Sequence, residues 1–139
     1  MLSISRYDQS YVDTCRARIG AQNSAYDDLA KQADASALAA FEPLFFNHMV
    51  MALDCYFGHR ARAVEGKDGN ALNEVRVLCN SFIQNDGVLM ADTQITLRPD
   101  ESQLGYRVGD RIALAAADFA RLSDAFFAEI EARYVGSSA

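Results

Sequence analysis

The chain has 139 residues, 50% of them hydrophobic and 23% charged, with 13 basic against 19 acidic side chains and a net charge of −6. This length predicts a single α-rich domain over residues 1–139 with short disordered ends, and the composition excludes a low-complexity or disordered protein. The excess of acidic groups argues against nucleic acid as a partner, because non-specific binding of nucleic acids depends on neutralising phosphates.

The cysteines and the apolar runs indicate where the protein resides. Cys15, Cys55 and Cys79 are odd in number and widely spaced, which is typical of a reducing compartment. Residues 1–18 contain no uninterrupted apolar stretch of signal-peptide length. The most apolar run, 43–53, is too short to span a bilayer, which takes about 20 residues. We therefore expect a cytoplasmic protein with no membrane partner.

The first predicted helix covers about residues 7–31, with Ser5 or Asp8 as its N-cap. Its apolar face follows steps of three and four residues through Tyr11, Cys15, Ile19, Gln22, Tyr26 and Leu29. A break is expected at 32–34.

The second predicted helix contains the most apolar sequence of the chain. Ser36 is the expected N-cap of residues 37–41, and Pro43 either kinks this helix or begins a separate one. In both cases we expect one long helix over 43–65. Residues 44–57 are apolar almost all round, which is typical of a central helix or of one shared with a second subunit.

A turn at 66–70 precedes the third predicted helix, 71–85, with Asn70 as its N-cap. Its expected buried face consists of Leu72, Val75, Leu78 or Cys79, and Phe82. Gly87 follows, in the position where a left-handed residue commonly ends a helix.

From 88 to 114 the pattern changes: Ile95 and Leu97 alternate with Thr96 and Arg98, and apolar residues flank the turn at 109–110, which predicts one or two short antiparallel ribbons. The last predicted helix covers 116–134, and residues 136–138 are expected to fray. Its expected inner face consists of Phe119, Leu122, Phe126, Ile130 and Tyr134. The predicted fold is thus mainly α: a bundle of about four helices with a small antiparallel β-ribbon between the third and last helices.

Several stretches resemble a small family of uncharacterised proteins from bacteria, actinobacteria among them. They are Glu65–Asn70, Leu72–Arg76, Val108–Ile112, Ala117–Phe119 and Phe126–Ile130. The resemblance covers most of the chain but implies no activity, so it assigns no role to any residue.

His48, Cys55 and His59 form one line on the predicted long helix, because seven- and four-residue steps return to nearly the same angle. Imidazole and thiolate are zinc ligands. His48 and His59 would be about 16 Å apart, however, so only Cys55 and His59 could share an ion. We favour the alternative that Cys55 is a core residue and the histidines are hydrogen-bonded at the core edge, and we expect no metal and no other cofactor.

Two further sets of residues are candidates for binding a ligand. Arg60 belongs to the local basic cluster 59–62 with Lys67, which either receives an anion or complements a helix dipole. Asn47, His48, Asp54, Asn73 and Asn80 are polar residues in apolar surroundings. Such residues either line a pocket between helices or tie helix ends to loops. The candidate ligand-binding residues are therefore His48, Asp54, His59, Arg60, Asn73 and Asn80.

The sequence carries none of the common catalytic motifs. It contains no G-x-G-x-x-G, Walker, H-E-x-x-H or G-x-S-x-G pattern, and no Glu-x-x-His pair for a di-iron centre. No residues are predicted to be catalytic, and an enzyme is the third hypothesis.

The leading hypothesis is a small helical protein without catalysis of its own that acts through homodimerisation or protein interaction. The expected interface includes part of the surface of 45–57 and of the aromatic-rich last helix. Phe126 is expected on the inner face of that helix, whereas Phe127 lies 100° further round and either matters less to the fold or belongs to the interface. The alternative is a bundle that binds a small molecule in a polar pocket near His48, Asp54, His59 and Asn80.

Overall fold

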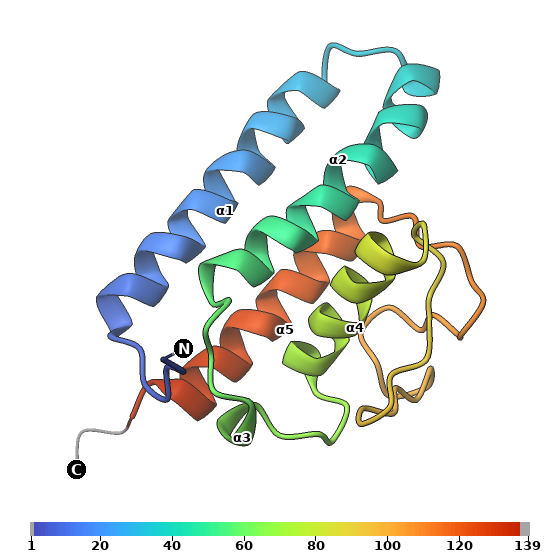
Figure 1. Ribbon diagram of the computed structural model, residues 1–139. Helices are drawn as coiled ribbons and strands as arrows, with labels where there is room; N and C mark the ends of the chain where they lie inside the picture. The colour runs from blue at the N-terminus through green and yellow to red at the C-terminus, as the bar shows by residue number, and fades with distance from the viewer. Residues whose placement is uncertain (1, 137–139) are drawn as a thin grey trace.

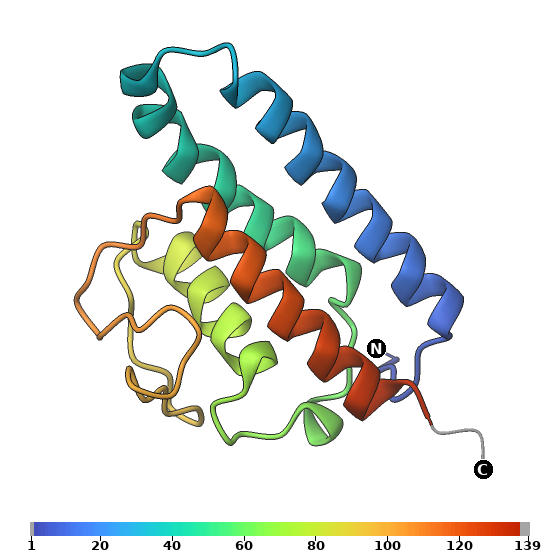
Figure 2. The same cartoon turned by 180° about the vertical axis from the view of Figure 1, so that it is seen from behind.

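The computed structural model describes residues 2–136, and within that range it contains five helices and no strand. α1 (Gln9–Ala30) and α2 (Ala35–Tyr56) form an antiparallel hairpin, and α3 (Arg62–Glu65) is a single turn. α5 (Ala116–Tyr134) lies behind α2 in Figure 1 and in front of it in Figure 2, and α4 (Ala71–Gln84) packs beside both. A mainly helical fold is confirmed, with one helix more than expected.

α1 buries a narrow strip, formed by Val12, Cys15, Ile19 and Tyr26. Asp8 occupies its N-cap position, but the Asp8 side chain makes no capping hydrogen bond. Tyr11 and Leu29, expected on the buried face, are 39% and 57% exposed. The C-terminal end of α1 and the N-terminal end of α2 form the tip of this hairpin and project beyond the other helices (Figures 1 and 2). The tip therefore buries little surface.

α2 begins earlier and ends earlier than predicted. Its N-cap is Asp34 rather than Ser36, since the Asp34 carboxylate accepts a hydrogen bond from the Ala37 amide. Pro43 lies inside the helix and not at its start. The expected helix over 43–65 is wrong, because α2 ends at Tyr56 and the chain then pairs with the N-terminal segment. Ile4 donates to the His59 carbonyl and accepts from the Ala61 amide, both at 2.7 Å.

α4 matches its prediction closely. The Asn70 side chain accepts from the amides of Leu72 and Asn73, which confirms it as the N-cap. Leu72, Val75, Leu78 and Cys79 are all buried.

The predicted β-ribbon between the third and last helices is wrong. Within residues 88–114 the backbone forms an isolated antiparallel bridge between Val88 and Arg111, flanked by hydrogen bonds from the Leu89 amide to Asp110 and from the Gly109 amide to Leu89, and no strand. Side-chain acceptors hold much of the rest of this segment: Asp92 accepts from the amides of Gln94 and Ile95, and Glu74 accepts from two further amides. Such contacts compete with the regular ladder that an alternating pattern would otherwise form.

The predicted inner face of α5 is buried throughout. Phe127 is also buried, at 2% exposure, because its ring meets the edges of Phe57 and Phe126 and Arg16 lies over it. The expectation that Phe127 lies off the buried face of the last helix is therefore wrong. Residues 137–138 of the expected frayed end lie outside the described residues.

Among the described residues, α2 is long and apolar enough to span a membrane by length and composition. It packs against α1, α4 and α5, which is compatible with the core helix of a soluble protein.

Candidate functional site

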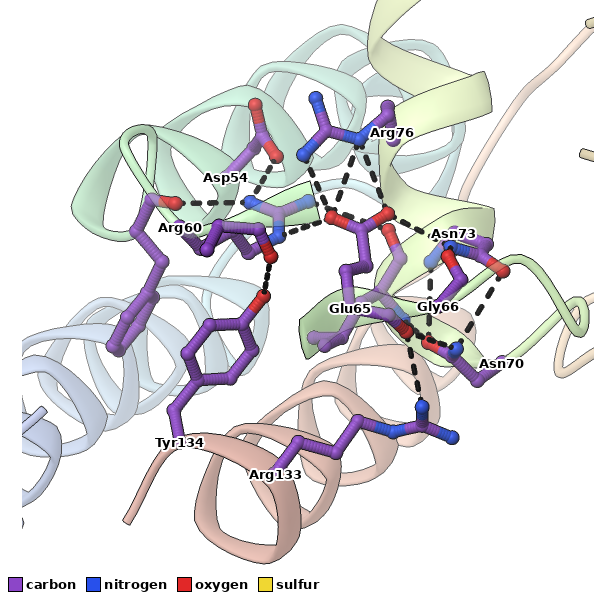
Figure 3. Close-up of polar contacts among 12 residues, drawn as sticks. Asp54, Arg60, Glu65, Gly66, Asn70, Asn73, Arg76, Arg133 and Tyr134 are labelled. Atoms are coloured by element: carbon purple, nitrogen blue, oxygen red, sulfur yellow. Dashed lines mark hydrogen bonds and ion pairs between the residues drawn. The ribbon is translucent and has the colours of Figure 1, made fainter. Parts of the chain in front are cut away.

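A cluster of charged side chains is buried where the chain passes through α3 (Figure 3). At its centre is the fully buried carboxylate of Glu65. Its Oε1 atom accepts hydrogen bonds from Arg60 Nε at 2.8 Å and Arg76 Nη2 at 2.7 Å. Its Oε2 atom accepts from Asn73 Nδ2 at 2.8 Å and Arg76 Nε at 3.1 Å. The carboxylate is thus fully hydrogen-bonded, as a buried charge must be.

Arg60 connects this cluster to the end of α2. Its side chain is 1% exposed, and Nη1 donates to Asp54 Oδ1 at 2.8 Å and to the Phe57 carbonyl at 3.1 Å. Nη2 donates to the Leu72 carbonyl at 3.3 Å. Burial leaves Arg60 no surface on which to receive a ligand from solvent.

The remaining contacts tie the turn around α3 to α5. Asn70 Nδ2 and Arg133 Nη1 both donate to the Glu65 carbonyl, at 2.9 and 3.0 Å. Tyr134 donates its hydroxyl to the Ala61 carbonyl at 2.7 Å. The end of α2, the turn around α3 and the start of α4, which follow one another in the chain, therefore meet the distant end of α5 at these residues (Figure 3).

The electrostatics of the cluster are balanced. Burial acts to raise the pKa of Glu65, but the hydrogen bonds from Arg76 and the charges of Arg60 and Arg76 outweigh it and lower that pKa. The pKa of Arg76 is raised, because its contacts with Glu65 outweigh the effect of burial. The guanidinium groups of Arg60 and Arg76 face the carboxylates of Glu65 and Asp54, so these charges balance, and their hydrogen bonds hold this turn in place.

The candidate residues from the sequence are only partly brought together. Asp54, Arg60 and Asn73 lie in the buried cluster. The other three line separate hollows of the surface: His48 beside α4, His59 near the N-terminal segment, and Asn80 under the long loop.

The cysteines differ in their surroundings. Cys55 and His59 line one hollow, but His59 lies beyond the end of α2, so the candidate pair on one helix turn does not form. The expectation that Cys55 is a core residue is wrong, because Cys55 is exposed. Within residues 2–136 no three His, Cys, Asp or Glu side chains are grouped to hold a metal. Cys79 is buried, and burial raises the pKa of its thiol, so it is not an activated nucleophile.

α2 carries a second apolar stripe, directly opposite its buried one. Its buried residues are Phe46, Met49, Val50 and Leu53. At 100° per residue, about 180° away, lies a stripe with steps of four and three residues. This outer stripe of α2 consists of Ala37, Phe41, Leu44, His48, Met51 and Cys55. Met51 is half-buried, and the other five are exposed.

A groove runs beside the outer stripe. It has a volume of about 520 Å³ and lies between α2, α4 and residues 111–113. Leu44 on one side and Ile83 on the other are each 68% exposed, and Met51 and Phe82 contribute further apolar surface. The only ionisable groups in its lining are His48, Asp86 and Arg111.

Comparison of the chain with protein-family models, with curated proteins and with solved structures found no match.

Proposed function

We propose that this protein acts by associating with a second copy of itself through the outer stripe of α2, and that it performs no catalysis of its own. The observation that carries the proposal is that α2 has two apolar faces on opposite sides. The chain covers one of them, while Leu44 and Phe41 on the other are 68% and 40% exposed.

The spacing of the outer stripe suits another helix better than an irregular partner. Apolar residues at alternating steps of three and four form the seam of a two-helix coiled coil. The stripe extends over 19 residues, from Ala37 to Cys55, which corresponds to about 27 Å of helix. An identical helix running antiparallel presents the same seam in return, as a two-fold interface requires.

The charge on this face also favours a second copy. Between Ala35 and Leu53 the only ionisable side chains are Glu42 and His48. The groove adds one acid, Asp86, and one base, Arg111. The chain as a whole carries a charge of −6, so an almost neutral face is where two copies approach with the least repulsion.

The outer stripe alone offers too little area for a stable interface, so the groove must contribute as well. A strip 27 Å long and about 10 Å wide covers only about 300 Å² per partner. Stable interfaces bury about 600–1,000 Å² per partner. We infer that the groove lined by Ile83 and Phe82 receives the partner's α2 ridge and supplies the remainder.

Three free cysteines are compatible with a reducing compartment, so we place this association in the cytoplasm.

The test is the molar mass in solution, measured by sedimentation velocity at concentrations up to about 100 µM. The wild-type chain is expected to be a dimer, and Leu44→Asp and Ile83→Asp are each expected to be monomers. Leu29→Asp is the matched control, because Leu29 is 57% exposed but lies on α1. It should remain dimeric. A monomeric wild-type protein, or equal weakening by all three substitutions, would contradict the proposal.

A further inference from the structure

A second hollow lies between α4 and the long loop, and it shares no lining residue with the groove beside α2. Its volume is about 310 Å³, at the lower end of the range for small-molecule pockets. We propose that this hollow binds a small apolar anion, such as a medium-chain carboxylate, whose charged group pairs with Arg107 at the rim.

The loop that covers the hollow is unusually long for a segment without regular structure. It runs from 85 to 115, and loops longer than about 12–15 residues are uncommon in compact domains unless they have a function. It is also held in a defined shape. Ser81 accepts from the Met90 amide, and Arg121 donates to the Gln103 carbonyl. The hollow is therefore formed before any ligand arrives.

Apolar side chains form about half of the walls of the hollow. They include Val77, Leu89, Ile95, Leu97, Tyr106 and Val108. Val77, Leu89 and Ile95 are almost fully buried and form its inner wall, whereas Val108 is 67% exposed. Tyr106 uses its hydroxyl to contact both the amide and the carbonyl of Ala113, so its ring is left as an apolar surface.

Two ionisable side chains other than Tyr106 line the hollow, Arg107 and Asp92. One oxygen of the Asp92 carboxylate is held by the loop, since Oδ1 accepts from the amides of Gln94 and Ile95. Arg107 is exposed, and within residues 2–136 it forms no salt bridge. An exposed cation beside the apolar part of the hollow favours a ligand with an apolar body and an anionic end.

Octanoate is a suitable probe, with octanol and octylamine as neutral and cationic counterparts. Methyl NMR spectra recorded during each titration report both the affinity and the place of binding. Shifts are expected at Val77, Ile95 and Val108, and octanoate is expected to bind more tightly than octanol or octylamine. Octylamine binding as tightly as octanoate would overturn the proposal, as would shifts confined to Leu44 and Ile83 or none at up to about 5 mM.

Two variants and one control separate the parts of the proposal. Arg107→Ala should weaken octanoate binding about fivefold, which is the effect of losing one partly exposed charge contact. Arg98→Ala is the control, because Arg98 lies in the same loop but outside the lining and near Glu101. Ala91→Phe should abolish binding, since Ala91 is exposed and the larger ring fills the hollow.

Equal affinity in the Arg107 and Arg98 variants would overturn the role of Arg107, and an unchanged affinity in Ala91→Phe would overturn the location. Thermal melts of each variant show whether it is folded. Failure of the dimer would leave this result unaffected, because the two surfaces have no lining residue in common.

Discussion

Two buried carboxylates, Glu65 and Glu74, have pKa values shifted in opposite directions. The partners of Glu65 include two guanidinium groups, and its pKa is lowered. Glu74 is 3% exposed and accepts only from the amides of Gln103 and Leu104. Burial raises the pKa of Glu74, and those two hydrogen bonds only reduce the effect. The same residue type thus contributes to stability with opposite dependence on pH.

Glu65→Gln is expected to lower the free energy of unfolding at pH 7 by about 3–5 kcal/mol, because it leaves Arg60 buried with only Asp54 as a counter-ion. Since the folded pKa is lowered, the charge on Glu65 stabilises the fold above the unfolded value of 4.5. That contribution is lost as the pH falls through the folded pKa. Urea denaturation from pH 7 to pH 3 should therefore show the variant and the wild type converging. Glu101→Gln, which removes a carboxylate from the exposed ion pair with Arg98, is the control. Its free energy of unfolding should change with pH in the same way as that of the wild type.

Glu74→Gln should show the opposite trend. A raised folded pKa contributes stability below the unfolded value of 4.5, and the contribution is lost as the pH rises through the folded pKa. The amide of glutamine retains one acceptor, so one loop amide loses its partner at a cost of about 1–3 kcal/mol. Denaturation curves should therefore show a larger loss near pH 4 than at pH 7. A loss that grows with pH would contradict this assignment. The Glu74→Gln variant should also show faster hydrogen exchange at the amide of Gln103 or Leu104 than the wild type.

At the scale of the helices, α5 buries neighbouring aromatic rings on a wide face. Phe126 and Phe127 are 0% and 2% exposed. Their rings lie 5.7 and 6.0 Å from that of Phe57, at the end of α2. Periodicity placed Phe127 beyond the inner face, but α1 covers that side of α5 as well. The aromatic side chains of α5 are therefore buried within one chain.

Phe126→Ala and Phe127→Ala are each expected to lower the free energy of unfolding by about 3–5 kcal/mol, the usual range for truncating a buried aromatic ring. Both losses should be independent of protein concentration. Chemical denaturation at two concentrations measures this. A small effect of Phe127→Ala that appears only in dilute samples would show that Phe127 belongs to an interface instead.

The end of α2 shows why a helix boundary cannot always be predicted from the local sequence. Residues 57–65 include Ala61, Arg62 and Ala63, which are good helix formers. The helix nevertheless stops, because Ile4 pairs with the backbone at 59–61 and Arg60 turns inward to Glu65. Both partners are supplied from outside the helix.

At the scale of the whole molecule, the proposed dimer links stability to concentration. Association stabilises the folded state by mass action. A tenfold increase in protein concentration should raise the melting temperature by about 2–3 °C for a dimer of this size. The melting temperature of the Leu44→Asp variant should not change with protein concentration. The outcome that contradicts the proposal is a wild-type melting temperature that does not change with concentration.

The amino-acid sequence by itself determined the helical class, the Asn70 cap, and the buried faces of α4 and α5. These depend on periodicity and on contacts within a few residues, which the local sequence specifies. Only the tertiary structure decided the end of α2 and the irregular course of 88–114. It also brought Arg60, Glu65 and Arg76 together. Glu65 and Arg76 lie on different helices, so no spacing relates them, and their burial is stable only because each supplies the other's charge and hydrogen bonds.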